Sequence, residues 1–135
     1  MKNIPTTCGA IAPEKVKNMS PLTLAYVGDA VYSLFVRTNL STSGDYKSGE
    51  LTKTVNNTVC ARAQSELMKS IVSQLTDEEY GVYKRAKNAK THNYPAHASI
   101  SEYHEATVFE ALIVYLYLSG KNDRLQLFLG EDYAN

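Results

Sequence analysis

Several features common in other protein classes are scarce or missing in this chain of 135 residues. It has only two cysteines, Cys8 and Cys60, without CxxC spacing or paired histidines, which argues against a disulfide framework and against a zinc site. Its 14 basic and 14 acidic residues cancel, so binding of a polyanion would require a local basic patch. Its longest apolar run is about half of a membrane span and contains an acid, which excludes a transmembrane helix. The N-terminus, MKNIPTTCGA, has no apolar signal segment, so we expect a soluble, cytoplasmic protein.

The chain also lacks the apolar-polar alternation of β-strands, whereas helical patterns recur along most of its length. Ser20 followed by Pro21 predicts a helix start, and this helix should end at about Leu40, before the sequence STSGD. Apolar residues then recur every four positions over 51–75, which predicts one amphipathic helix.

The second half of the chain contains clear helix boundary signals. Thr76 and Glu79 form a capping box that starts the next helix. Gly120 is placed to end a later apolar helix, and Asn122 or Asp123 to cap a last short helix through Leu129. We therefore predict a single all-α domain, preceded by an arm or short helical turn over residues 1–19.

Two apolar helical stretches each contain one carboxylate. Asp29 is at the centre of 24–32, LAYVGDAVY, and Glu110 is near the start of 108–118, VFEALIVYLYL. Helices that are apolar all round belong in a core, where acids are rarely buried without a partner. Neither stretch supplies a Lys or Arg within a turn of its acid, so the counter-charge comes from elsewhere in the fold, from a water-filled cleft, or from a divalent cation shared by both acids.

The neighbours of these acids leave alternatives open. Gly28 permits either close packing of another helix or access of a ligand to Asp29, which itself has Arg37 as one possible ion-pair partner. Small side chains one turn before or beside the acids, Ala25, Ala106 and Thr107, would leave room for a hydrated Mg²⁺.

A basic stretch, KRAKNAK, precedes a polar loop at 91–101 and the helix of Glu110. It contains Lys84, Arg85, Lys87 and Lys90. A solvated helix face is the usual explanation of such a run, but its position favours a phosphate-binding role. His92 and His104 are weaker candidates for phosphate contacts.

These motifs, in this order and spacing, resemble the ribonuclease III family. LAYVGDAVY resembles the signature helix of its nuclease domains, and TVFEALI at 107–113 resembles their second acidic motif. Together with ARAQ at 61–64, LTDEE at 75–79, KRAKNAK, and EYHEATVFEALI at 102–113, the chain is similar to the mini branch, Mini-ribonuclease III, which consists of the nuclease domain alone. The resemblance covers about 20–125 and implies a ribonuclease III-like helical endonuclease domain over 20–135.

The resemblance implies a homodimer that cuts double-stranded RNA with Mg²⁺, or with Mn²⁺ as a possible substitute, and that matures the precursor of large-subunit ribosomal RNA. Asp29 and Glu110 fall on the catalytic metal ligands of the family. Lys84, Arg85, Lys87, Lys90, His92 and His104 become the expected RNA contacts. Since no separate RNA-binding domain fits in the chain, substrate choice would come from the nuclease domain itself or from a ribosomal protein.

The sequence departs from the larger enzymes of the family at two acidic positions. Ala25 stands where they have a glutamate and Thr107 where they have an aspartate, so only two carboxylates remain as direct metal ligands. The mini branch is similar at both positions, and we therefore expect an active enzyme. Two other hypotheses are a non-catalytic relative that binds structured RNA during ribosome assembly, and a generic helical interaction protein.

Overall fold

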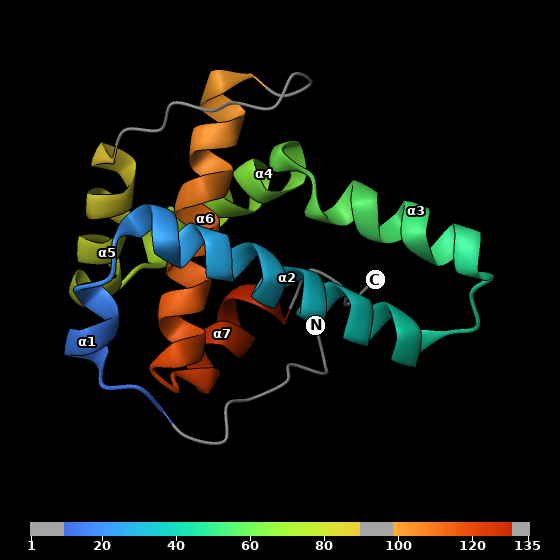
Figure 1. Ribbon diagram of the computed structural model, residues 1–135, viewed down its shortest axis with the longest axis horizontal. Helices are drawn as coiled ribbons and strands as arrows, with labels where there is room; N and C mark the ends of the chain where they lie inside the picture. Colours follow the sequence, from blue (N-terminus) through green and yellow to red (C-terminus); the bar gives the residue numbers. More distant parts are fainter. Residues whose placement is uncertain (1–9, 90–98, 131–135) are drawn as a thin grey trace.

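The computed structural model of the protein describes residues 10–89 and 99–130, and helices make up most of this part of the chain (Figure 1). No strand occurs in the described ranges, and the prediction of an all-α fold is confirmed. The elements are α1 (Pro13–Lys17), α2 (Pro21–Ser43), α3 (Ser48–Val59), α4 (Ala61–Ile71), the 3₁₀ turn η1 (Val72–Gln74), α5 (Asp77–Asn88), α6 (Ile100–Leu118) and α7 (Asn122–Leu129).

Helix α6 is the centre of the fold, with α2, α4, α5, α7 and α1 packed around it (Figure 1). From Glu105 to Leu116 every residue except Glu110 is buried. This helix is apolar all round, so it can exclude water only when neighbours cover every side. The sequence prediction of a core helix at this position is confirmed.

The end of α6 follows from Gly120, as its sequence position predicted. Gly120 has a φ of 74°, in the left-handed region that favours glycine. Its N–H donates to the carbonyl of Tyr117, and the N–H of Lys121 donates to that of Leu116, a Schellman arrangement. The chain therefore turns sharply into α7, but Lys121 and not Asn122 or Asp123 occupies the N-cap position, without a side-chain cap. The predicted cap is therefore wrong by one or two residues, a common difference at helix boundaries.

The predicted single helix over 51–75 is wrong, because the chain breaks at Cys60. Cys60 has an extended backbone, with φ −68° and ψ 158°, and separates α3 from α4. Helix α3 packs along the second half of α2, whereas α4 packs on α6, so one straight helix could not cover both (Figure 1). Gln64 stabilises the break because its buried amide donates to the carbonyl of Val59, which ends α3.

Helix α2 is only partly a core helix. One face is buried against α6, but Leu22, Tyr26 and Leu34 are 42%, 83% and 45% exposed, and Ala30 between them is exposed too. These four residues recur every four positions and form an exposed apolar stripe. The expectation that this stretch is buried all round is therefore wrong for this face.

The division of the chain at residue 19 stays a prediction. Within the described residues of the proposed arm, 10–19, α1 packs on α6 and its Val16 is fully buried. None of the helices in the described ranges combines the length and apolar character needed to cross a membrane.

Candidate carboxylate site and basic surface

Gly28 sets the distance between the two helices that hold the acids. A Cβ atom at this position would lie 2.2 Å from the carbonyl oxygen of Glu110 and 3.0 Å from its Cβ. Helices α2 and α6 therefore touch backbone to backbone at this crossing, which no residue other than glycine permits without a shift. Of the two explanations left open for Gly28, the structure supports close helix packing.

The two acids lie near each other in unequal surroundings. Asp29 follows Gly28 on α2 and is exposed, whereas Glu110 on α6 is largely covered. Burial, together with the negative charge of Asp29, raises the pKa of Glu110 to about 8. A carboxyl group with such a pKa is mostly protonated at neutral pH unless a cation stabilises its charged form.

No basic side chain supplies that cation in the described part of the chain. Neither acid takes part in a salt bridge there, and the possible pair of Asp29 with Arg37 is not formed. The same ranges hold no cluster of three or more potential ligands among His, Cys, Asp and Glu. Two neighbouring carboxylates without a counter-charge in this part of the chain are oxygen ligands of the kind that hard divalent cations take.

The small side chains near the acids help the helices to pack. Ala25, Ala106 and Thr107 are 8%, 3% and 7% exposed, and the hydroxyl of Thr107 donates to the carbonyl of Tyr103 in its own helix. They are covered by neighbouring atoms and leave no broad opening of their own. Ligand access to the pair is therefore from the exposed side of Asp29, beside the apolar stripe of α2.

The basic stretch on α5 presents its cations in different ways. Lys84 is exposed, forms no salt bridge in the described ranges, and lies 5.9 Å from the ring centroid of Tyr80. The Tyr80 ring stacks on Tyr83 with centroids 5.6 Å apart. Lys84 is thus the cation of this helix that is best placed to meet an external anion.

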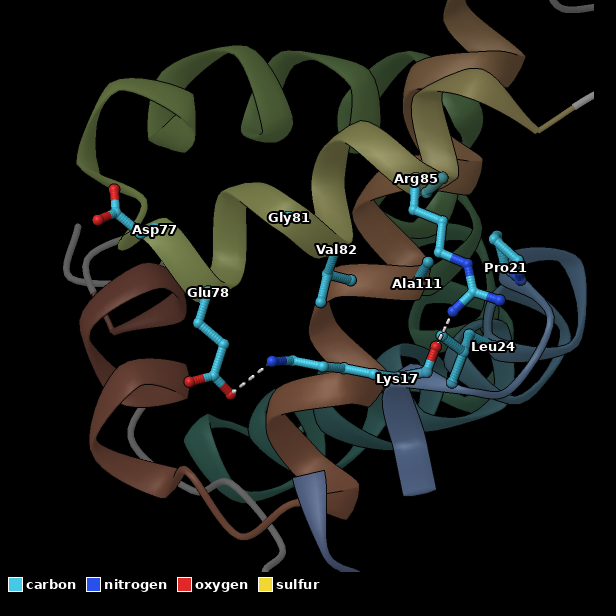
Figure 2. A pocket seen from close by; sticks show the side chains of 10 residues that line it. Lys17, Pro21, Leu24, Asp77, Glu78, Gly81, Val82, Arg85 and Ala111 are labelled. Atoms are coloured by element: carbon cyan, nitrogen blue, oxygen red, sulfur yellow. Dashed lines mark hydrogen bonds and ion pairs between the residues drawn. The ribbon is translucent and has the colours of Figure 1, made fainter. Parts of the chain in front are cut away.

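Arg85 is also exposed but points toward α1. Its guanidinium donates to the carbonyl of Lys17, at the rim of a cavity of about 320 Å³ between α1, α2, α5 and α6 (Figure 2). The side chain of Lys17 reaches across this rim to Glu78, at 3.7 Å. Neither Asp29 nor Glu110 lines the cavity, so it is separate from the carboxylate pair.

Lys87 and His104 contact each other's helices. The ammonium of Lys87 forms an ion pair with Glu105 of α6, and Nε2 of His104 lies 2.6 Å from the carbonyl oxygen of Lys87. Both residues therefore bind protein groups at the junction of α5 and α6. Lys90 and His92 lie outside the described residues, so their proposed RNA contacts stay predictions from the sequence.

Two features were missed in the sequence. Glu105 is buried at 7% exposure, but it lies before the apolar run that contains Glu110, so the sequence pattern does not single it out. Tyr26 is the most exposed of the large apolar side chains on α2, and the spacing of 22, 26, 30 and 34 was the available signal for an outward face.

Comparison with known proteins identifies the family of the chain. The Ribonuclease III domain family model matches residues 22–121. The chain is 43% identical to Mini-ribonuclease 3 of Brevibacillus brevis over 85% of its length and 86% of that protein, and 39% identical to Mini-ribonuclease 3 of Enterococcus faecalis over 82% and 85%. A crystal structure of a Fusobacterium nucleatum protein matches with a TM-score of 0.77 and 35% identity, covering 86% of this chain and 93% of that one. The chain therefore belongs to the ribonuclease III family, in its Mini-ribonuclease 3 branch.

Proposed function

We propose that this member of the ribonuclease III family is an endoribonuclease that cleaves double-stranded RNA at the Asp29 and Glu110 pair. The observation that supports this most directly is the approach of two carboxylates at the Gly28 crossing without a basic partner in the described residues. Such an arrangement costs stability, and a helical binding module gains nothing from it. A site for a catalytic cation gives it a purpose.

Asp29 and Glu110 would hold Mg²⁺, with Mn²⁺ as a possible substitute. When bound, the ion supplies a water of lowered pKa and positive charge beside the scissile phosphate. Glu110 must be ionised to act as a ligand, so its raised pKa couples metal binding to the release of a proton. Asp29, at the surface, lies where a phosphodiester can approach. Hydrolysis would leave a 5′-phosphate and a 3′-hydroxyl.

The RNA duplex would be held mainly through its backbone. A-form RNA is recognised by shape and by phosphate and 2′-hydroxyl contacts across its shallow minor groove. Lys84 and Arg85 are exposed on α5 and are our first candidates for phosphate contacts, with Lys90 and His92 as further ones from the sequence. Substitution of these residues should weaken binding without altering base preference.

A homodimer would place two such sites on one duplex. The exposed apolar stripe of α2, at Leu22, Tyr26, Ala30 and Leu34, lies on the same helix as Asp29. We propose that a second copy covers this stripe about a two-fold axis, so that each site cuts one strand and the cuts are staggered. Tyr26→Glu should yield monomers in sedimentation velocity, whereas Leu127→Glu, at a 49% exposed residue of α7, should not. A dimeric Tyr26→Glu variant would contradict this placement.

The proposed substrate in the cell is the precursor of large-subunit ribosomal RNA, processed in the cytoplasm. A ribosomal protein bound to the precursor would help to present it to the nuclease domain. Purified precursor stem should be cut at discrete positions, and more efficiently with large-subunit proteins added. Cleavage spread along the stem under both conditions would contradict this choice of substrate.

The central experiment is cleavage of a long double-stranded RNA with Mg²⁺ by the unaltered protein and by Asp29→Asn. Asp123→Asn, at an exposed residue of α7, is the matched control. We expect cleavage by the unaltered protein and the control, and none by a folded Asp29→Asn. If none of the three cuts but all bind the duplex, the enzyme proposal fails and a non-catalytic ribosome assembly role takes its place.

A further inference from the structure

A second buried acid lies about one and a half turns before Glu110 on α6. Glu105 is 7% exposed, and its carboxylate forms an ion pair with the ammonium of Lys87, whose side chain is 39% exposed. A buried carboxylate requires a partner of opposite charge, and Lys87 is the residue that provides it. The positive charge of Lys87 is therefore largely neutralised by Glu105 within the protein.

His104 adds a second contact at the same place. The carbonyl of Lys87 can only accept a hydrogen bond, so the Nε2 atom 2.6 Å away must carry a hydrogen and donate it. Helix α5 ends at Asn88, so the carbonyls of its last turn receive no hydrogen bond from a following turn of the helix. His104 thus satisfies one of these carbonyls and caps the end of α5.

From these contacts we propose that Glu105, Lys87 and His104 form a clasp that positions α5 on α6 for RNA binding, so that Lys84 and not Lys87 makes a phosphate contact. This inference rests on the proposed function, because the cations of α5 are taken to face RNA. At its other end α5 is fixed through Glu79, which binds Arg124 of α7. The clasp fixes the C-terminal end of α5, which lies nearer to Lys84. The position of Lys84 relative to Glu110 therefore depends on the clasp.

The proposal separates two lysines one turn apart on the same helix. Lys84 has no ion-pair partner in the described ranges, whereas Lys87 has Glu105. Affinity for RNA falls as salt rises. Loss of one phosphate contact makes the plot of log affinity against log salt less steep, reducing the magnitude of its slope by about 0.7 to 0.9. Loss of a positioning residue weakens binding at all salt concentrations without that change of slope.

The experiment measures duplex binding over a range of KCl concentrations in an Asp29→Asn background, which prevents cleavage. We expect Lys84→Met to lower the slope by about 0.7 to 0.9, and Lys87→Met to leave it unchanged. In the active protein, Lys87→Met and Glu105→Gln should each lower kcat/KM by about 10- to 100-fold, the scale of a small displacement. The double variant, with Lys87→Met and Glu105→Gln, should be less impaired than either single variant because no unpaired charge remains.

Amide hydrogen exchange tests the clasp without RNA. Glu105→Gln should speed exchange at 85–88, whereas Glu102→Gln, earlier on the same helix, should not. The proposal is overturned if Lys87→Met lowers the salt slope as Lys84→Met does, or if exchange at 85–88 is unaltered by Glu105→Gln. If the unaltered protein fails to bind the duplex, the proposed function fails, and the exchange experiment alone decides whether the clasp exists.

Discussion

Glu79 and Glu110 are glutamates on two packed helices, and their surroundings are opposite. Burial alone would raise the pKa of Glu79, but hydrogen bonds from Arg124 and from the backbone of Thr76 hold it below its usual range. The nitrogens of Arg124 lie 2.7 and 2.8 Å from its two oxygens. Glu110 has no such partner in the described residues, and its strongest charged neighbour is the acid Asp29.

The difference separates a buried acid that belongs to the architecture from the one that we propose for the chemistry. Glu79 completes the capping box of α5 and binds α7, so all of its interactions are already satisfied within the fold. Glu110 is held where its ionised form is unfavourable, and either a proton or an external cation relieves this. Unpaired charge of this kind is concentrated at functional sites.

The largest effect expected is on catalysis at Glu110. Glu110→Gln should lower duplex cleavage by about 1,000-fold or more, because it removes a charge that stabilises the reacting centre. Its thermal stability should be unchanged or higher, since the repulsion with Asp29 is lost. Cleavage assays and thermal melts with EDTA check both parts. A variant that retains activity would place the chemistry elsewhere.

Moving the two acids apart tests the same site through the backbone. Gly28→Ala places a Cβ against the Glu110 carbonyl and should destabilise the fold by about 3 kcal/mol, the upper part of the usual range for overpacking. Gly81→Ala is the matched control, because a Cβ at this exposed position of α5 meets nothing within 4 Å, and it should stabilise the fold by about 0.5–1 kcal/mol. Urea denaturation of both variants measures the contrast, and equal effects would contradict the packing role of Gly28.

Substitution of Glu79 should lower stability and spare activity, the opposite of what we expect at Glu110. Glu79→Gln should lower the free energy of unfolding by about 2–3 kcal/mol, because Arg124 loses its charged partner. The turnover number of the folded protein should stay within about threefold, a change too small for a lost transition-state contact. Denaturation and initial-rate measurements decide, and a stable but inactive Glu79→Gln variant would reverse the roles assigned to the two acids.

A further effect expected is the pH dependence of stability without divalent metal. The pKa of Glu110 is raised from 4.5 to about 8, so between these values the folded protein holds a proton that the unfolded chain has lost. Stability should therefore fall as pH rises from 5 to 8, by up to about 1.4 kcal/mol per unit. The pKa of Glu79 is lowered, so its contribution is complete above 4.5 and is lost only as pH falls further.

Chemical denaturation in EDTA across this range isolates the Glu110 contribution. Glu110→Gln should remove the slope, and saturating Mg²⁺ should reduce it in the unaltered protein because metal binding favours the ionised carboxylate. A slope that is the same in the variant would assign the proton to another group.

Local signals predicted much of the fold correctly. The capping box of Thr76 and Glu79 and the positive φ of Gly120 depend on residues within a few positions, so the sequence was sufficient for both. The break at Cys60 was missed because α3 and α4 keep the same four-residue apolar spacing on each side. Its cause is long-range, since α3 packs on α2 and α4 on α6.

The candidate site divides in the same way. Asp29 and Glu110 could be chosen from motifs. These two residues are 81 positions apart in the sequence, however, and they come close in space only because α2 and α6 cross at Gly28, which sequence spacing does not reveal. The partner of Lys87 was missed for a similar reason, because Glu105 comes from another helix. Sequence patterns single out charged residues, but they do not give the contacts that these residues make across helices.

The Gly28 contact also limits how this enzyme can vary. Glycine is already the smallest residue, so every substitution at position 28 can only widen the separation of α2 and α6. Mutational drift at this position is therefore one-directional, toward a larger space between the acids and never a smaller one. An engineer who wants a tighter site would have to change the opposing surface of α6, where the obstacle is a main-chain carbonyl that no substitution removes.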